Sequence, residues 1–159
     1  MSSNPIIAFY GGGVDGSGRT LTQILGWNDE MMEKVHDWVQ WVFPNREVSR
    51  FNPEAPLMDD EAAEALSSPE LRGRVLSAVS RFERFLHLNE ERPHWVTRGN
   101  HNCLRITRLL KFMVEVGMRP DAEVMLKRLE EIYEANSHLV STTTVRLWRE
   151  AVGGEVTHG

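Results

Sequence analysis

Residues 68–88, SPELRGRVLSAVSRFERFLHL, carry the clearest helix signal in the chain. Ser68 is a suitable N-cap, and Pro69 suits the first turn of a helix. Apolar residues then recur every three or four positions, which places them on one helix face. These are Leu71, Val75, Ala78, Val79, Phe82, Phe85 and Leu86. The stretch predicts an amphipathic helix that buries this face.

The arginines of the same stretch are spread around the predicted helix. They are Arg72, Arg74, Arg81 and Arg84. A groove for a phosphate backbone would collect them on one side. The distribution therefore predicts a solvated surface.

The same periodicity extends in both directions from this helix. It predicts helices over residues 29–42, 59–66, 101–117, 120–136 and 141–153, separated by connectors at 43–58 and 89–99. Asn28, Asp59 and Ser141 are expected N-caps, and the short turn Gly117–Pro120 predicts an antiparallel helix pair. The predicted fold is all-α, a single compact multi-helix domain over residues 1–159. A glycine-rich arm (1–19) and a flexible tail (153–159) flank it.

The arm contains GVDGSGRT, residues 13–20, which resembles a phosphate-binding loop with arginine in place of lysine. Such a loop needs a parallel sheet around it, and the sequence offers at most one short strand, at residues 5–8. Arg19 also lacks the compact ammonium of a lysine. We interpret the segment as a loop whose Thr20 caps a short helix.

Composition narrows the functional classes further. The chain has 159 residues, a net charge of −5 and one cysteine. A chain with a negative net charge is not expected to bind nucleic acid, and a single cysteine cannot form an internal disulfide. Neither a membrane-spanning run nor a signal peptide is visible. We expect a cytoplasmic protein with no cofactor and no bound metal.

Two polar rows on the predicted helices form the candidate site. The first joins His36 and Gln40, with Trp41 adjacent, and the second joins His101, Arg105 and Arg108, with Asn100 just ahead. Guanidinium groups near a helix N-terminus suit carboxylates or phosphates. The favoured hypothesis is a binding module that holds a small anionic or peptide ligand between the two helices.

Other functions remain open at this level. Gln40 and the arginines can instead anchor the loop at 44–58. An enzyme would use His36 or His101 as acid–base, with Arg105 and Arg108 orienting an anionic substrate. A module without a pocket would dock a protein partner, or a second copy, through exposed tryptophans. Cys103 is expected to be a buried, inert thiol.

Three blocks of sequence carry a family resemblance. HDWVQWVFP (36–44), FNPEAPL (51–57) and NHNCLRITRLLKFMVEVG (100–117) resemble the conserved region of the opioid growth factor receptor family, and GRTLTQILGW (18–27) is similar to the opening of its short prokaryotic-type members. The resemblance implies a helical domain. It also implies kinship with an intracellular receptor for enkephalin-type peptides that restrains cell growth. It transfers no catalytic residues.

Overall fold

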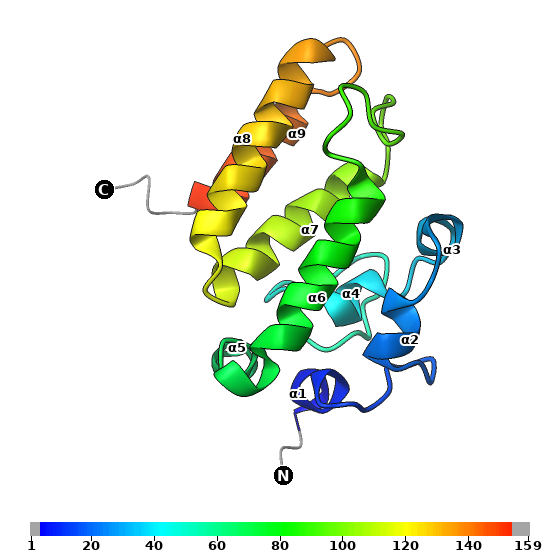
Figure 1. Cartoon of the computed structure of the whole chain (residues 1–159), viewed down its shortest axis with the longest axis vertical. Coiled ribbons are helices and arrows are strands. Elements are labelled where there is room, and N and C mark those ends of the chain that lie inside the picture. Colours follow the sequence, from blue (N-terminus) through cyan, green and yellow to red (C-terminus); the bar gives the residue numbers. More distant parts are fainter. Residues whose placement is uncertain (1–3, 154–159) are drawn as a thin grey trace. The chain divides into compact units, whose positions relative to one another are not determined.

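The computed structural model describes residues 4–153, and the regular elements in that range are helices (Figure 1). They are α1 (Pro5–Tyr10), α2 (Leu21–Leu25), α3 (Asp29–Lys34), α4 (Val39–Val42), α5 (Asp60–Leu66), α6 (Pro69–Leu86), α7 (Asn102–Glu115), α8 (Arg119–Ala135) and α9 (Thr142–Gly153). The extended pairing found there is one isolated bridge between Val14 and Thr20. The predicted all-α class is confirmed.

The chain divides into two compact units at the end of α6. The first unit runs to Phe85 and holds α1 to α5 with nearly all of α6, and the second begins at Leu86 and holds α7 to α9. The single domain expected from the sequence therefore stays a prediction.

In the first unit, the long helix α6 is tied to the short N-terminal helices. Its apolar stripe is buried from Val75 to Leu86, as predicted. Arg74 donates a hydrogen bond to the Tyr10 carbonyl at 2.6 Å, and Arg81 donates to the Trp27 carbonyl at 2.7 Å. Arg81 is only 9% exposed and also pairs with a carboxylate of α3. The predicted solvated surface holds for Arg74 and Arg84, which are exposed. It is wrong for Arg81, which is buried because its guanidinium satisfies the Trp27 carbonyl and Asp29.

The helix predicted over residues 29–42 is broken. Asn28 caps α3 as expected, but α3 ends at Lys34 and α4 begins only at Val39. The chain turns back so that the Trp38 indole N–H reaches the Met32 carbonyl at 3.2 Å. Trp38 is fully buried, with its ring edge-on to Phe82 at 5.7 Å between centroids. Burial of this indole outweighs the hydrogen bonds of a continuous helix.

The N-terminal arm also differs from the prediction. Residues 5–8, which could have formed a short strand, belong to α1, where Asn4 is the N-cap and Pro5 lies in the first turn. The Asn4 side-chain amide donates to both carboxylate oxygens of Asp59 at 3.1 Å, and Asp59 caps α5 as predicted. Ser68, the expected cap of α6, instead donates its hydroxyl to the Ala65 carbonyl at 2.6 Å.

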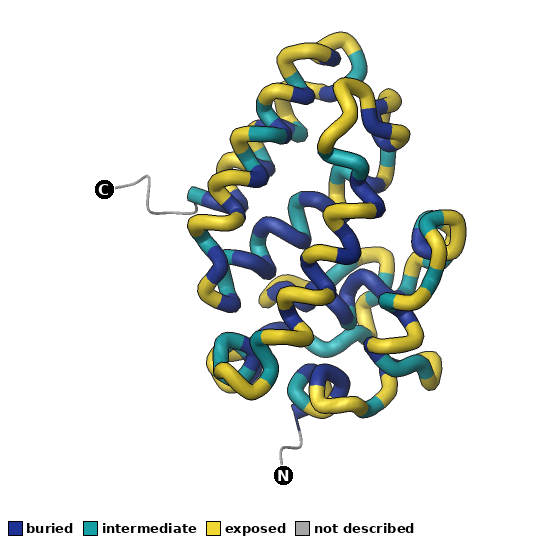
Figure 2. The backbone as a smooth tube through the Cα atoms, in the orientation of Figure 1, coloured by how far each residue is buried: buried dark blue, intermediate teal, exposed yellow. Residues whose placement is uncertain are grey.

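The second unit is a set of three helices that pack against one another. Helices α7 and α8 form the predicted antiparallel pair, and Gly117, with φ 82°, lies in the turn between them (Figure 1). The buried residues of α8 lie on the side that faces α7 and α9 (Figure 2). Ser141 caps α9 as expected, through a 3.1 Å hydrogen bond from the Thr144 amide. The predicted tail, beyond Gly153, lies outside the described residues.

Three tryptophans are fully buried and share one feature. Trp38, Trp95 and Trp148 each donate the indole N–H to a backbone carbonyl, those of Met32, Leu86 and Cys103 respectively. Trp27 and Trp41 are half-buried. None of the tryptophans is exposed, so the exposed tryptophan patch considered above does not form. Within residues 4–153, no helix has both the length and the hydropathy to cross a membrane.

Candidate functional site

The second polar row lies on one helix, as predicted. The Asn100 side-chain oxygen accepts the Asn102 amide at 2.9 Å, and its amide group donates to the Thr97 hydroxyl at 3.0 Å. Asn100 thus helps to start α7. His101 occupies the N-cap position and is exposed. The row His101, Arg105 and Arg108 runs along the first turns of α7.

The arginines of α7 differ in their exposure. Arg105 is 7% exposed, and its Nη1 donates to the Asn102 side-chain oxygen at 3.4 Å, while Asn102 is fully buried. Arg108 is half-buried one turn later. Lys111 follows, and the first carboxylate of the helix comes only at Glu115. The first three turns of α7 therefore carry positive charge in a chain whose net charge is negative.

The first polar row is not formed as predicted, because the chain is not helical at His36. His36 is exposed and lies in the break between α3 and α4. Gln40 is 7% exposed, and its side-chain amide contacts the Ser49 hydroxyl and the Asn52 amide, both at 3.5 Å. This agrees with the loop-anchoring role considered for Gln40. Trp41 packs edge-on against Phe9 at 5.6 Å between centroids.

The seven predicted site residues thus divide between the two units. His36, Gln40 and Trp41 belong to the first unit, and Asn100, His101, Arg105 and Arg108 belong to the second. Within the second unit, Arg105 and Arg108 lie on α7, and Asn100 and His101 directly precede that helix. Within the first unit, Gln40 and Trp41 neighbour each other on α4, and His36 precedes that helix.

The glycine-rich segment closes into a compact turn. The Asp15 carboxylate accepts the backbone amides of Ser17 and Arg19, both at 2.9 Å, and pairs with the Arg19 guanidinium at 2.8 Å. Gly18 has φ +83°, and a Cβ on Gly13 would lie 2.9 Å from the Ala8 carbonyl oxygen. Both positions therefore require glycine.

Arg19, which stands where a phosphate-binding loop has lysine, is already engaged. It bonds Asp37 at 2.8 Å as well as Asp15, and its guanidinium lies over Trp27 at 5.3 Å from the ring centroid. Sequence reasoning missed this network, although the four-residue spacing of Asp15 and Arg19 is a signal for it. Thr20 caps α2 through a capping box with Gln23, as predicted. The loop interpretation of the segment agrees with this geometry.

Cys103 and Asp37 are two titratable groups with shifted pKa values. Burial raises the pKa of the Cys103 thiol to about 11, so it stays protonated at neutral pH. Cys103 is half-buried, however, and not fully buried as predicted. Burial acts to raise the pKa of Asp37, but hydrogen bonds from Arg19 and Ser17 and the Arg19 charge bring it below its usual value. Among residues 4–153, no three His, Cys, Asp or Glu side chains gather as a metal site.

Comparison with known proteins places this architecture in a family. Residues 19–143 match the model of the opioid growth factor receptor conserved region. The rat opioid growth factor receptor is 32% identical, over 64% of this chain and 21% of that protein. Opioid growth factor receptor-like protein 1 of Xenopus tropicalis is 32% identical, over 68% of this chain and 24% of that protein. The human opioid growth factor receptor is 30% identical, over 60% of this chain and 16% of that protein.

The chain therefore spans about a fifth of the length of these curated relatives. No solved structure matches it. The family model covers the chain from Arg19, at the end of the glycine-rich turn, to the first turn of α9. This protein belongs to the opioid growth factor receptor family.

Proposed function

We propose that this chain is a ligand-binding module whose α7 helix holds a small anionic ligand or an acidic peptide. The observation that carries the proposal is the positive charge at the start of α7, where Arg105, Arg108 and Lys111 precede any carboxylate of that helix. The rat relative is named a receptor and the Xenopus tropicalis relative is named receptor-like, which supports a binding role. A location in the cytoplasm remains part of the same proposal.

In this proposal Arg108 makes the main contact with the anion. It is half-buried, and a guanidinium binds a carboxylate through two parallel hydrogen bonds. Arg105 supports it from a buried position, with its guanidinium oriented by Asn102. His101 and Asn100 lie one turn earlier, where an amide and an imidazole add hydrogen bonds.

The residues of the first unit take a different role. Gln40 anchors the connector after α4, because its side chain contacts Ser49 and Asn52. Asn52 also donates to the Asp37 carbonyl at 3.3 Å. The binding proposal therefore rests on α7, and we assign Gln40 to holding the loop.

A titration followed by NMR tests the proposal. The probe is an acetylated peptide with two glutamates, added to the full chain while the backbone amides and the arginine Nε–H signals are recorded. We expect saturable shifts at residues 100–112, lost in Arg108→Ala. Arg98→Ala, which removes an exposed cation ahead of α7, serves as the matched control and should bind like the unmodified chain.

Melting temperatures separate binding from structure. We expect Arg108→Ala to weaken binding of the peptide at least tenfold while the melting temperature changes little. Arg105→Lys is the second variant. It is chosen over Arg105→Ala because complete removal of the buried side-chain charge would threaten folding. Equal losses of binding and stability, or shifts that persist in Arg108→Ala, would show that the α7 arginines are structural.

A further inference from the structure

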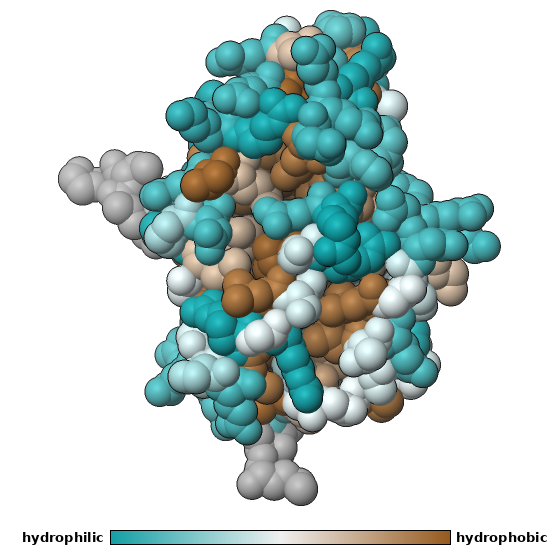
Figure 3. Space-filling model, viewed as in Figure 1, coloured by the Kyte–Doolittle hydropathy of each residue, from teal (hydrophilic) through white to brown (hydrophobic). Residues whose placement is uncertain are grey.

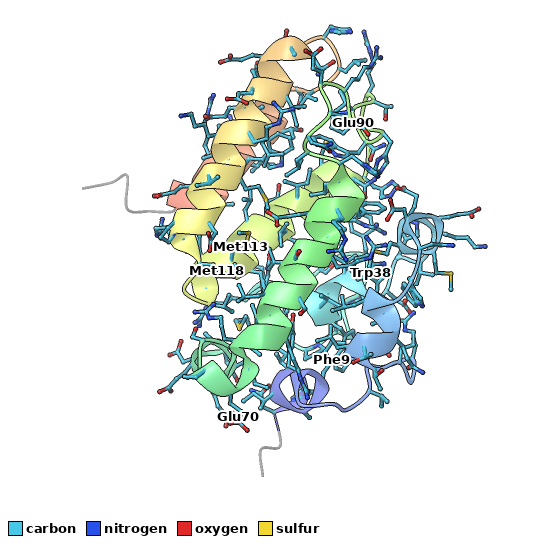
Figure 4. All side chains as sticks on the ribbon, in the orientation of Figure 1. Phe9, Trp38, Glu70, Glu90, Met113 and Met118 are labelled. Carbon is cyan, nitrogen blue, oxygen red and sulfur yellow. The ribbon has the colours of Figure 1, made fainter. Side chains whose placement is uncertain are left out.

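The first unit contains an open cleft that none of the predicted site residues lines. It has a volume of about 560 Å³ and lies between the end of α1, helix α2 and the first half of α6. Phe9, Leu21 and Leu25 form its apolar part. Figure 3 shows hydrophobic surface between α2 and α6, and Figure 4 places Phe9 between α1, α2 and α6. This volume falls in the range of small-molecule sites.

One wall of the cleft carries a positive charge without a carboxylate partner. Arg74 lines the cleft, and its Nη1 donates to the Tyr10 carbonyl at 2.6 Å. Among residues 4–153 no carboxylate pairs with Arg74, whereas Arg19 and Arg81 of the same unit each bond at least one aspartate. The contact with Tyr10 fixes one edge of the guanidinium and leaves its remaining N–H groups to solvent or to a ligand.

The cleft also offers hydroxyl groups and room beside the arginine. Thr22 and Ser77 line it and are exposed, and their side-chain hydroxyls make no hydrogen bond with any group of the described residues. Thr20 differs, because its hydroxyl already caps α2. Opposite Arg74, Gly12 has no side chain, and a Cβ added there would lie 3.9 Å from Nη1.

We infer that this cleft binds a small monocarboxylate with a hydrocarbon body. The carboxylate accepts hydrogen bonds from Arg74 and the Ser77 hydroxyl, and the hydrocarbon lies against Leu25 and Leu21, with the buried Phe9 beneath them. A single carboxylate is the matching group, because Arg74 is the one charged residue in the lining. A phosphate dianion would leave one charge uncompensated beside an apolar wall. The site is separate from the α7 arginines and does not depend on them.

Three probes test the charge and the hydrocarbon separately. Octanoate carries both, 1-octanol carries the hydrocarbon without the charge, and acetate carries the charge without the hydrocarbon. Calorimetry with the full chain should show octanoate binding at least tenfold more tightly than 1-octanol and acetate, since a charge-assisted pair adds to the apolar contact. Backbone amide shifts should fall at residues 9–26 and 74–77. Equal affinities for octanoate and 1-octanol, or shifts elsewhere, would overturn the inference.

Variants of α6 test whether Arg74 supplies the positive charge that binds the carboxylate. Arg74→Gln should lower octanoate affinity to that of 1-octanol and leave 1-octanol binding unchanged, and Arg74→Lys should restore part of the difference. Arg84→Gln is the matched control, since Arg84 hydrogen-bonds the Ser80 hydroxyl and no other group among residues 4–153, and lies outside the cleft. If Arg74→Gln fails to fold, the probe comparison in the unmodified chain and Arg74→Lys still decide. If a folded Arg74→Gln variant bound octanoate as tightly as the unmodified chain, the proposed role of Arg74 in this cleft would be wrong. This outcome is independent of whether the acidic peptide binds at α7.

Discussion

The two units of this chain reach stability by different routes. The second unit uses long helices, α7 to α9, that pair through short turns and bury continuous apolar faces. The first unit surrounds α6 with five helices of four to seven residues, which are too short to persist alone. Side chains tie these short helices to distant backbone carbonyls, as Arg74, Arg81 and Tyr10 do. The long helices make such bonds too, as Arg128 and Trp148 do. The short helices depend on them more strongly, because they have few intrahelical hydrogen bonds of their own.

The largest test of this contrast is Trp38→Ala. Trp38 is fully buried against Phe82 and holds the break between α3 and α4 through its bond to Met32. We expect a loss of about 3–5 kcal/mol in the free energy of unfolding, as for other large-to-alanine changes in a core. Urea denaturation measures it, and a loss below about 1 kcal/mol would contradict this role for Trp38.

A matched pair of phenylalanine variants sharpens the same contrast. Trp38→Phe and Trp148→Phe each remove one indole N–H that donates to a backbone carbonyl at 3.2 Å. The lost hydrogen bond costs about 1 kcal/mol in each case. Hydrogen exchange should rise across residues 29–42 in Trp38→Phe, while α9 keeps its protection in Trp148→Phe because its helix is continuous.

Helix caps provide a smaller test. Thr20 and Gln23 form a capping box on α2, which has five residues, and Ser141 caps α9, which has twelve. We expect Thr20→Ala to cost about 1 kcal/mol of unfolding free energy and Ser141→Ala about 0.5 kcal/mol. The difference arises because α2 has few other intrahelical hydrogen bonds. Denaturation of both variants checks it, and an equal or larger cost for Ser141→Ala would count against the contrast.

The smallest expected effect concerns the ion pair of the glycine-rich turn. Interaction with Arg19 and Ser17 lowers the folded-state pKa of Asp37 below 3.8, so its contribution is complete above that value and disappears as the pH falls through the folded pKa. Asp37→Asn should therefore cost about 0.5 kcal/mol at pH 7, since the carboxylate is half exposed, and less at pH 3. Denaturation at pH 7, 5 and 3 measures the difference from the unmodified chain, and a cost independent of pH would argue against the ion pair.

Much of the second unit could be predicted, because its helices are specified by apolar spacing and turn residues that are close together in the sequence. The spacing of Ile106, Leu109 and Met113 gave the buried face of α7, and Gly117 marked its end. The break at residues 35–38 gave no such signal, since Met32, Val39 and Val42 also fit one continuous helix. Its cause is the burial of Trp38 against Phe82, a residue far along the chain.

The two candidate sites differ in the same way: one depends on residues close in sequence and the other on residues far apart. The row of Arg105 and Arg108 was visible in the sequence because both residues lie on one helix. The charged wall of the cleft was not visible in the sequence, because Arg74 is positioned by the Tyr10 carbonyl, 64 residues away along the chain. A sequence shows that an arginine is present, whereas its partner depends on which backbone group the fold brings within reach.

The sequence alone determined the all-α class and the starts of α2, α3, α5 and α9, because their caps act within three or four residues. Only the tertiary structure decided where the helix after Asn28 breaks, which carbonyls Arg74 and Arg81 satisfy, and that a cleft opens beside α2. The physical reason is that buried polar groups and large aromatic side chains must find partners across the chain, and local sequence does not specify those partners.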